Sequence, residues 1–141
     1  MDTDLKILFL NPPFLPKFSR SQRSPAVIKS GTIYYPLWLA YAAGFLLKQG
    51  FDVNLIDAPA EGYDLSQTLD LVKSFNPRMV VIDTSTPSID SDATVAEEIK
   101  KSLPDVFLVM VGTHVSATTD ETLKNYPWVD SIARKEYDET L

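Results

Sequence analysis

Short apolar segments bounded by Pro, Gly or Asn alternate with longer segments of helical periodicity along the whole chain. The short segments are nearly continuous runs of aliphatic and β-branched residues, which is typical of parallel strands buried on both faces. The longer segments carry apolar residues three or four positions apart, which is typical of helices packed on such a sheet. The predicted strands are 5–10, 51–56, 79–83, 106–111 and 130–133, and the predicted helices are 36–49, 65–75, 92–103 and 120–126.

This alternation predicts an α/β fold of three layers, in which helices cover both faces of a doubly wound parallel five-stranded sheet. For a chain of 141 residues we expect the flavodoxin-like, or Rossmann-like, strand order 2-1-3-4-5. An apolar fraction of 45% supports one hydrophobic core, so residues 1–141 are predicted to form one domain. The chain ends abruptly in polar residues at 135–141, and we expect it to be a fragment of a longer enzyme.

Charge and residue types exclude several classes of function. The 19 acidic and 13 basic residues give a net charge of −6, which disfavours binding to nucleic acid or to an anionic membrane. The chain opens with Asp2 and Asp4 and contains no long apolar run, so we expect a cytoplasmic location. The absence of cysteine excludes disulfides, thiolate zinc sites and an iron-sulfur cluster held by this segment.

Ligands of open parallel sheets bind outside the carboxyl ends of the strands, where the strand order reverses. Small polar residues follow two of the predicted strands, and their hydroxyls and glycine permit the close approach of amide or phosphate groups. These residues are Thr84, Ser85, Thr86 and Ser88 after one strand, and Gly112, Thr113, His114, Ser116, Thr118 and Thr119 after the next. They are equally what ordinary loops and helix caps contain, with Ser91 or Asp92 as the amino cap of the helix 92–103.

Other candidate residues lie near the same edge. His114 is the only histidine, and a cofactor contact and a structural role are both open for it. Asp57 and Asp83 end two strands, but no substrate pose defines them as an acid and a base. The long loop 14–35 is expected to be functional, because long ordered loops usually are. Tyr34, Tyr35, Trp38 and Tyr41 cluster where this loop meets the next helix, either as an exposed face for a cofactor or partner domain, or as core.

Five motifs, taken in order, resemble the amino-terminal cobalamin (vitamin B12)-binding domain of radical S-adenosylmethionine enzymes, including the group of the anaerobic Mg-protoporphyrin ester cyclase. Together the motifs span almost the entire chain. They are ILFLNPP at 7–13, YYPLWLAYAAGFLLKQGFDVNLIDA at 34–58, NPRMVVIDTSTPS at 76–88, VMVGTHVSATTDETL at 109–123 and VDSIARKEYDETL at 129–141.

The resemblance implies that this domain binds cobalamin, a metal-containing cofactor, and holds it against a carboxyl-terminal radical barrel. S-Adenosylmethionine and a [4Fe-4S] cluster are expected only in that barrel, which this sequence lacks. No catalytic residue is therefore expected in this chain alone. The complete protein is expected to be a radical S-adenosylmethionine methyltransferase or a cyclase-type oxidoreductase.

The resemblance also implies which residues contact the cofactor. Related methyltransferases and mutases place a histidine beneath the cobalt from an Asp-x-His-x-x-Gly motif after the first strand. Because this chain has Asn11-Pro12-Pro13 there, the cobalamin is expected to be base-off without a histidine ligand from this loop. The contacts that the resemblance implies are Asn11, Pro12, Pro13, Thr84, Ser85, Thr86, Gly112, Thr113, His114 and Glu136.

The last motif departs from the family pattern. Where the family commonly has an Arg-Gly-Glu-Gly-Glu turn, this chain has Arg134-Lys135-Glu136-Tyr137-Asp138. Lys135 and Tyr137 thus replace two glycines that would allow positive φ or the close approach of a ligand. A related domain that docks to the barrel without a cofactor therefore stays open as an alternative.

A phosphoacceptor receiver domain is a rival of another class with the same fold. Asp83, Thr113 and Lys135 occupy the strand ends at which a receiver keeps its aspartate, hydroxyl and lysine. A receiver also needs carboxylates after the first strand to bind Mg²⁺, and Asn11-Pro12-Pro13 supplies none. The receiver is therefore the less favoured of the two.

Overall fold

Five parallel strands form a single sheet in the order β2-β1-β3-β4-β5 in the computed structural model, which describes residues 4–21 and 25–141. This is the predicted flavodoxin-like order, and helices cover the sheet as expected. Asp2 and residues 22–24 of the predicted loop lie outside the described residues. The strands are β1 (Lys6–Asn11), β2 (Asp52–Asp57), β3 (Met79–Asp83), β4 (Phe107–Val111) and β5 (Ser131–Ile132). The helices are α1 (Leu37–Lys48), α2 (Ala58–Glu61), α3 (Leu65–Phe75), α4 (Ile89–Ser102), α5 (Thr113–Ala117) and α6 (Thr119–Asn125), with the 3₁₀ turn η1 (Thr86–Ser88).

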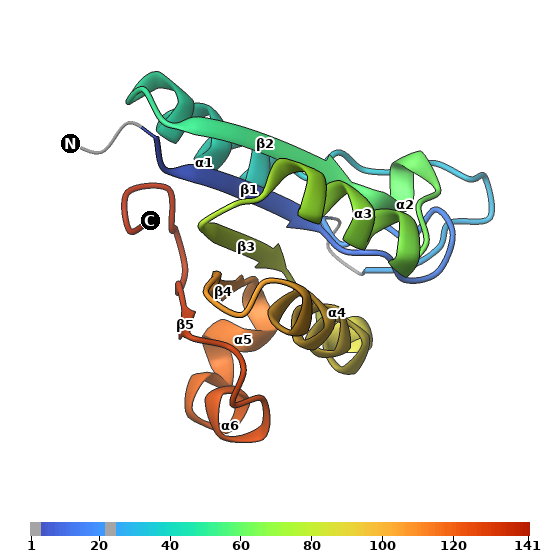
Figure 1. Cartoon of the computed structure of the whole chain (residues 1–141). Coiled ribbons are helices and arrows are strands. Elements are labelled where there is room, and N and C mark those ends of the chain that lie inside the picture. The colour runs from blue at the N-terminus through green and yellow to red at the C-terminus, as the bar shows by residue number, and fades with distance from the viewer. Residues whose placement is uncertain (1–3, 22–24) are drawn as a thin grey trace.

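The strand register brings all the carboxyl ends to one edge of the sheet. β1 lies between β2 and β3 and pairs with both, with Asn11 opposite Asp57 and Leu10 opposite Ile82. β3 pairs with β4 so that Asp83 lies opposite Val111. Figure 1 shows the carboxyl ends of β1 and β2 pointing toward α2 and the long loop before α1. This edge is the place at which a ligand of such a sheet binds.

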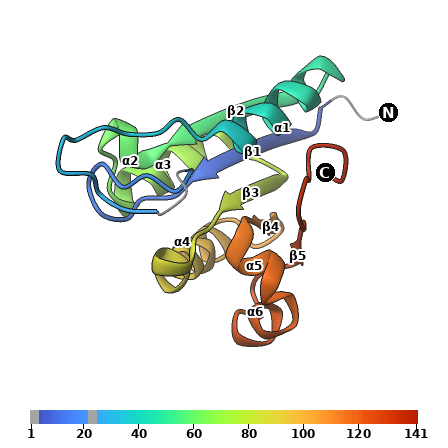
Figure 2. The ribbon, with the colours of Figure 1, turned by 180° about the vertical axis from the view of Figure 1, so that it is seen from behind.

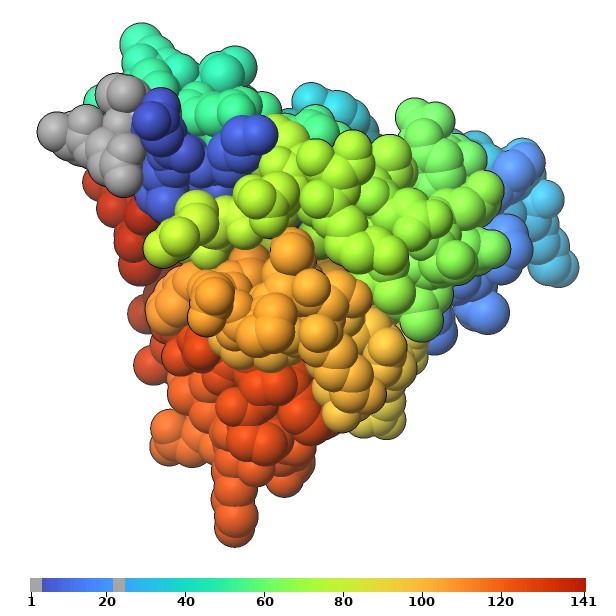
Figure 3. Space-filling model, in the orientation of Figure 1, coloured from blue at the N-terminus to red at the C-terminus, as the bar shows by residue number. Residues whose placement is uncertain are grey.

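Alternate residues of each strand point to opposite faces, and each face has its own core. On one face, Leu8, Val80 and Leu108 pack with α3 and α4, which lie side by side in Figure 3. On the other face, Phe9 and Val81 pack with α1 and with the chain after β5, as Figure 2 shows from behind. The strands are therefore buried on both faces, which explains their continuous apolar runs.

Local signals fix the helix α3 and strand β3 at their predicted residues. Asp64 caps α3 by accepting a hydrogen bond from the Gln67 backbone at 2.8 Å, and the Gln67 side chain accepts one in return from the Asp64 backbone at 3.0 Å. Asn76 ends the helix in the left-handed conformation, with φ of 53°. Pro77 follows and cannot continue the helix, so β3 can begin shortly afterwards.

One local prediction is wrong. Neither Ser91 nor Asp92 caps α4, because that helix begins at Ile89 and both residues lie inside it. Asp92 is fully buried there by a contact from a distant part of the chain. Two short helices were not expected: α5 follows β4, and α2 follows β2 directly.

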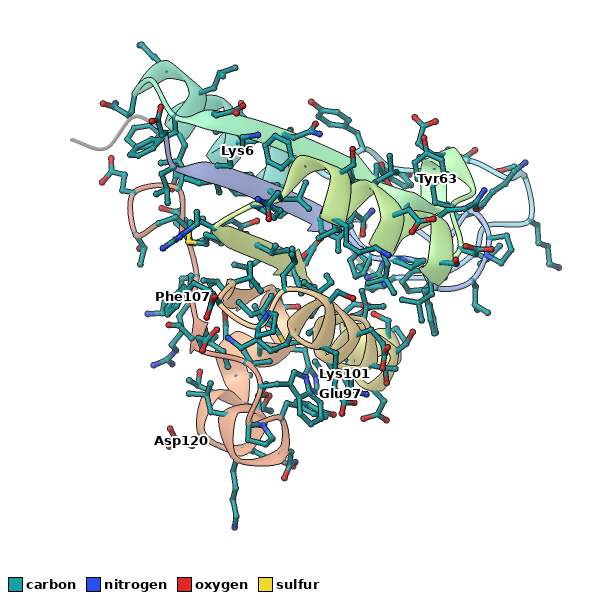
Figure 4. All side chains as sticks on the ribbon, viewed as in Figure 1. Lys6, Tyr63, Glu97, Lys101, Phe107 and Asp120 are labelled. Carbon is teal, nitrogen blue, oxygen red and sulfur yellow. The ribbon has the colours of Figure 1, made fainter. Side chains whose placement is uncertain are left out.

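The opposite edge of the sheet carries its own polar contacts. Figure 4 labels Lys6 and Phe107, which stand at the starts of β1 and β4. Nearby, Lys100 Nζ lies 2.8 Å from Asp130 Oδ2 and donates to the Val106 carbonyl at 2.7 Å. In the described part of the chain, none of the helices combines the length and apolarity needed to cross a membrane.

Candidate ligand-binding site

Asn11, the last residue of β1, joins two neighbouring segments at the carboxyl edge of the sheet. Its Nδ2 donates to Asp57 Oδ1 at the end of β2 at 2.9 Å, and its Oδ1 accepts from Arg20 Nη1 at 2.8 Å. The residue is only 2% exposed. Pro12 and Pro13 are also buried, so this predicted contact segment forms the floor of the edge and is not a free surface.

Arg20 is a buried cation that the sequence analysis did not single out. Its Nη2 lies 2.6 Å from Asp92 Oδ1, its Nη1 donates to the Pro12 carbonyl at 2.7 Å, and its Nε donates to Ser88 Oγ at 3.3 Å. The loop around Arg20 has no periodicity, and no local pattern predicts which of its cations turns inward. The guanidinium lies beneath the ends of β1 and β3, where it joins their following segments.

The two hydroxyls that follow Thr84 and precede α4 complete this buried network. Ser85 Oγ and Ser88 Oγ lie 2.6 Å apart, and Ser88 Oγ donates to Asp92 Oδ2 at 2.7 Å. Ser85 is 3% exposed, so its hydroxyl supports the edge from inside the protein. Of the hydroxyls predicted after β3, this leaves Thr86 as the one on the surface.

Gly112 follows β4 and packs directly against Thr84. The Thr84 hydroxyl donates to the Val111 carbonyl at 2.7 Å, which draws the two loops together. Gly112 has φ of +121°, and a Cβ built on it would lie 2.5 Å from the Thr84 carbonyl oxygen. The glycine is therefore required by the contact between the loops, whether or not a ligand also approaches it.

The exposed rim above this floor is polar. His114 Nδ1 lies 3.2 Å from Thr86 Oγ1, which joins the segment after β3 to the start of α5. Thr113, next to His114, is exposed. These three side chains are brought together by the strand order, and they can donate or accept hydrogen bonds to a ligand lying on the edge.

Three carboxyl groups lie around the buried guanidinium of Arg20. Burial raises the pKa of Asp83 to about 7 and that of Asp92 to about 6, and the charge of Arg20 opposes both increases. Burial also raises the pKa of Asp57, against the hydrogen bond from Asn11. Asp83 keeps part of its surface exposed at the end of the central strand β3. The floor of the edge is therefore acidic, with Arg20 as its compensating charge.

In the turn after β5, Lys135 adopts the positive φ that the family's glycine would allow. Lys135 has φ of +60°, and its backbone N–H donates to Ser116 Oγ at 3.2 Å. Tyr137 is 6% exposed and packs in the core against α1 and β1, with the pKa of its hydroxyl raised by burial. Glu136 between them is exposed and is not drawn into the network around Arg20. The replaced glycines are thus accommodated by a left-handed lysine and a buried tyrosine.

The aromatic residues before and within α1 are exposed. Tyr35, Trp38 and Tyr41 keep 66%, 62% and 62% of their surface accessible, and Tyr34 keeps 51%. The Trp38 and Tyr41 rings lie 6.4 Å apart on the outer side of the helix. The prediction that this cluster forms an exposed face is confirmed, and the alternative that it belongs to the core is wrong.

A surface cleft of about 370 Å³ opens beside the floor of the edge. It lies between the amino-terminal parts of α3 and α4 and the segment after β1. Its lining residues are Pro13, Phe14, Leu15, Asp64, Leu65, Ser91, Thr94 and Val95. Within residues 4–21 and 25–141, no three His, Asp or Glu side chains converge as a metal site would require.

Comparisons with known proteins identify the family of this chain. The family model described as the B12 binding domain matches residues 23–141. An uncharacterized methyltransferase of Pyrococcus horikoshii is 34% identical over 134 residues, which cover 94% of this chain and 27% of that protein. The anaerobic magnesium-protoporphyrin IX monomethyl ester cyclase of Rubrivivax gelatinosus is 30% identical over 107 residues, which cover 75% of this chain and 19% of that enzyme.

Two solved structures share the fold. The cobalamin-dependent S-adenosylmethionine radical enzyme OxsB, solved with aqua-cobalamin and S-adenosylmethionine bound, aligns over 96% of this chain and 17% of its own with a TM-score of 0.74 and 16% identity. A CheY-like protein, TadZ of Pseudomonas aeruginosa, aligns over 97% of this chain and 94% of its own with a TM-score of 0.62 and 11% identity. At such identities the two structures support the fold alone. The chain spans about a quarter of the length of the first curated relative and about a fifth of the second.

Proposed function

The chain belongs to the B12-binding domain family, and from this membership we propose that it holds a base-off cobalamin over the carboxyl ends of β1, β3 and β4. The observation that carries the location is the polar rim of Thr86, Thr113 and His114 above a buried floor. A corrin ring is broad and flat and carries amide side chains around its periphery. Hydroxyl and imidazole groups suit these amides, because they both donate and accept hydrogen bonds.

The predicted contacts divide into two groups in this proposal. Thr86, Thr113 and His114 face outward and would touch the cofactor directly. The contacts predicted at Asn11, Pro12, Pro13, Thr84 and Ser85 are buried, so their part is to shape the floor. Gly112 keeps the loops after β3 and β4 in contact, and Glu136 remains a proposed contact at the far end of the rim.

The segment after β1 decides whether this domain would supply a histidine ligand to the cobalt. No histidine follows β1, and the Asn11 amide is occupied by Asp57 and Arg20. The only histidine of the chain, His114, lies after β4 and bonds to Thr86. We therefore propose that no histidine from the segment after β1 would replace the nucleotide base beneath the cobalt.

We further propose that the complete protein uses the cofactor for methyl transfer or related radical chemistry, with S-adenosylmethionine and an iron-sulfur cluster held by a barrel domain. Cobalamin, when bound, supplies a carrier for a methyl group. This domain contributes binding and orientation only, because its rim offers no pair of groups placed as an acid and a base. The support is that both curated relatives extend far beyond the region that matches this chain.

An exposed aromatic surface supports the proposal of a barrel domain that packs on this one. Its residues are Tyr34, Tyr35, Trp38 and Tyr41. Aromatic side chains contribute strongly to the binding free energy of protein interfaces. An exposed group of four such rings is typical of a surface that a partner covers. The surface begins where the loop 14–35 ends and continues into α1. We propose that the barrel covers this surface in the complete protein.

An absorbance and calorimetric titration of the 141-residue domain with hydroxocobalamin tests the cofactor. We expect saturable binding with a base-off spectrum. Replacing the rim groups by Thr86→Val with His114→Phe should weaken binding about tenfold, the effect of two lost hydrogen bonds. Thr140→Val, an exposed threonine away from the rim, is the matched control and should leave the affinity unchanged.

The same titration separates the alternatives. An absence of binding would refute cofactor binding by this domain and favour a cofactor-free docking domain. Binding that ignores the rim variants would place the cofactor elsewhere on the chain. Mg²⁺-dependent phosphorylation of Asp83 by a small phosphodonor would instead support the receiver interpretation.

A further inference from the structure

We infer that Arg20 is a positioning residue of the proposed cobalamin site, which sets the spacing of the segments after β1 and β3 from beneath. This inference rests on the proposed function. Arg20 itself is 6% exposed, so it would act on the cofactor through the residues that it holds.

The guanidinium connects segments that are far apart in the sequence. Nη1 donates to Asn11 Oδ1 and to the Pro12 carbonyl at 2.8 and 2.7 Å, which fixes the chain as it leaves β1. Nη2 and Nε donate to Asp92 and Ser88, which fixes the start of α4 after β3. Both segments carry predicted cofactor contacts, so one side chain sets the distance between them.

The geometry requires an arginine and not merely a positive charge. A planar guanidinium can donate in several fixed directions at once, whereas an ammonium is a compact charge with no such fork. The rings of Phe14 and Phe18 flank the group, with their centroids 6.0 and 5.3 Å from the guanidinium carbon. They shield the charge from water, which strengthens its bonds to Asp92 and Asn11.

The residue next to Arg20 connects two described parts of the loop that leads to the aromatic surface. Ser19, next to Arg20, pairs with Ala26 through two backbone hydrogen bonds of 3.1 and 3.3 Å. Its hydroxyl accepts from the Tyr34 backbone N–H at 2.8 Å. Arg20 therefore fixes the first part of the loop 14–35 to the end of β1. Ser19 then binds the last part of the loop through Ala26 and Tyr34.

These buried contacts also fix the position of Thr86 on the rim. Asn11 is held between Arg20 and Asp57, and Ser85 is held through Ser88. Thr86 directly follows Ser85, so its position on the rim depends on the buried network below it. A loosened network would move Thr86 relative to the end of β1 without removing any group that touches the cofactor.

The test compares Arg20→Lys with Lys100→Met in hydroxocobalamin titrations at a temperature where circular dichroism shows each variant to be folded. Arg20→Lys keeps the positive charge but loses the planar guanidinium that donates several hydrogen bonds at once. We expect it to weaken binding about tenfold or more. Lys100→Met removes the partly buried ion pair with Asp130 at the opposite edge. It should lower the thermal midpoint and leave the affinity within about twofold, because it lies away from the site.

A double-mutant cycle distinguishes positioning from stability alone. If Arg20 positions the rim, Thr86→Val should weaken binding in the wild type and have little further effect in the Arg20→Lys background. Should Arg20→Lys fail to fold, Asp92→Asn keeps the size of its partner and is expected to weaken binding in the same sense. Wild-type affinity in both variants, or an equal loss in Lys100→Met, would overturn the inference. Absence of binding by the wild type would instead refute the proposed function.

Discussion

Gly112 lies so close to Thr84 that a Cβ on the glycine would stand 2.5 Å from the Thr84 carbonyl oxygen. We expect Gly112→Ala to lower the free energy of unfolding by about 3 kcal/mol or more, since it adds a backbone clash to a positive φ. Urea denaturation measures the loss. A variant at Gly112 is therefore a poor probe of cofactor contact, because it would disturb the loops first.

Gly44 provides the matched control in the same chain. It lies within α1, and a Cβ there would meet nothing within 4 Å. Gly44→Ala should raise the free energy of unfolding by about 0.5–1 kcal/mol through its better helix propensity. Equal effects of alanine at the two positions would contradict the close packing of Gly112 on Thr84.

Asp83 makes the stability of the domain depend on pH. Burial raises its pKa in the folded state from 3.8 to about 7, so the folded protein binds the proton more tightly than the unfolded chain. Its stabilising contribution is complete below pH 3.8 and is lost as the pH rises to about 7. Asp83→Asn removes this loss, and its stability relative to wild type should increase by about 1–2 kcal/mol between pH 4 and 7, discounted for partial exposure.

Urea denaturation at several pH values measures this difference. Asp52→Asn, at an exposed position at the start of β2, serves as the control and should show no comparable trend. A constant difference between Asp83→Asn and the wild type across the range would argue against a buried, protonatable Asp83.

Lys135 holds a conformation that glycine adopts more easily. Because its φ is +60°, we expect Lys135→Gly to raise the free energy of unfolding by about 0.5–1 kcal/mol. Lys124→Gly, inside the helix α6, should lower it by about 1 kcal/mol. Thermal or urea denaturation compares the two, and destabilisation by both substitutions would contradict strain at Lys135.

The aromatic surface beside α1 should contribute little to the stability of the isolated domain. Trp38 is 62% exposed, so Trp38→Lys should change the free energy of unfolding by no more than about 0.5 kcal/mol. Leu39→Ala, at the next position but 1% exposed, should cost about 3 kcal/mol. A large loss in Trp38→Lys would show that the ring belongs to the core and not to an interface.

The sequence predicted the elements whose limits are set locally. The segments 65–75 and 79–83 form at the predicted residues, because a capping box, Asn76 and Pro77 act within a few positions of them. The strand order and the crowded carboxyl edge also followed from the alternation of strands and helices. The family resemblance agrees with the match of residues 23–141.

Long-range contacts account for what could not be predicted. Asp92 resembled a helix cap by residue type, but it forms an ion pair with Arg20. No local sequence pattern predicts that the Arg20 side chain points into the protein. The division of the predicted contacts into a buried floor and an exposed rim depends on the same network. Gly112 suggested room for a ligand, whereas the space beside it is filled by Thr84.

The ion pair of Arg20 with Asp92 joins residues 72 positions apart in the chain. Contacts of such sequence separation are paid for in loop-closure entropy and depend on prior assembly of the intervening elements. During folding, Arg20 cannot form its direct ion pair with Asp92 until α4 has formed and packed on the sheet. A truncated chain ending before α4 would keep Asn11, Thr84 and Ser85 but lose Asp92, the ion-pair partner of Arg20. The buried network at the carboxyl edge therefore depends on cooperative folding and not on the amino-terminal half alone.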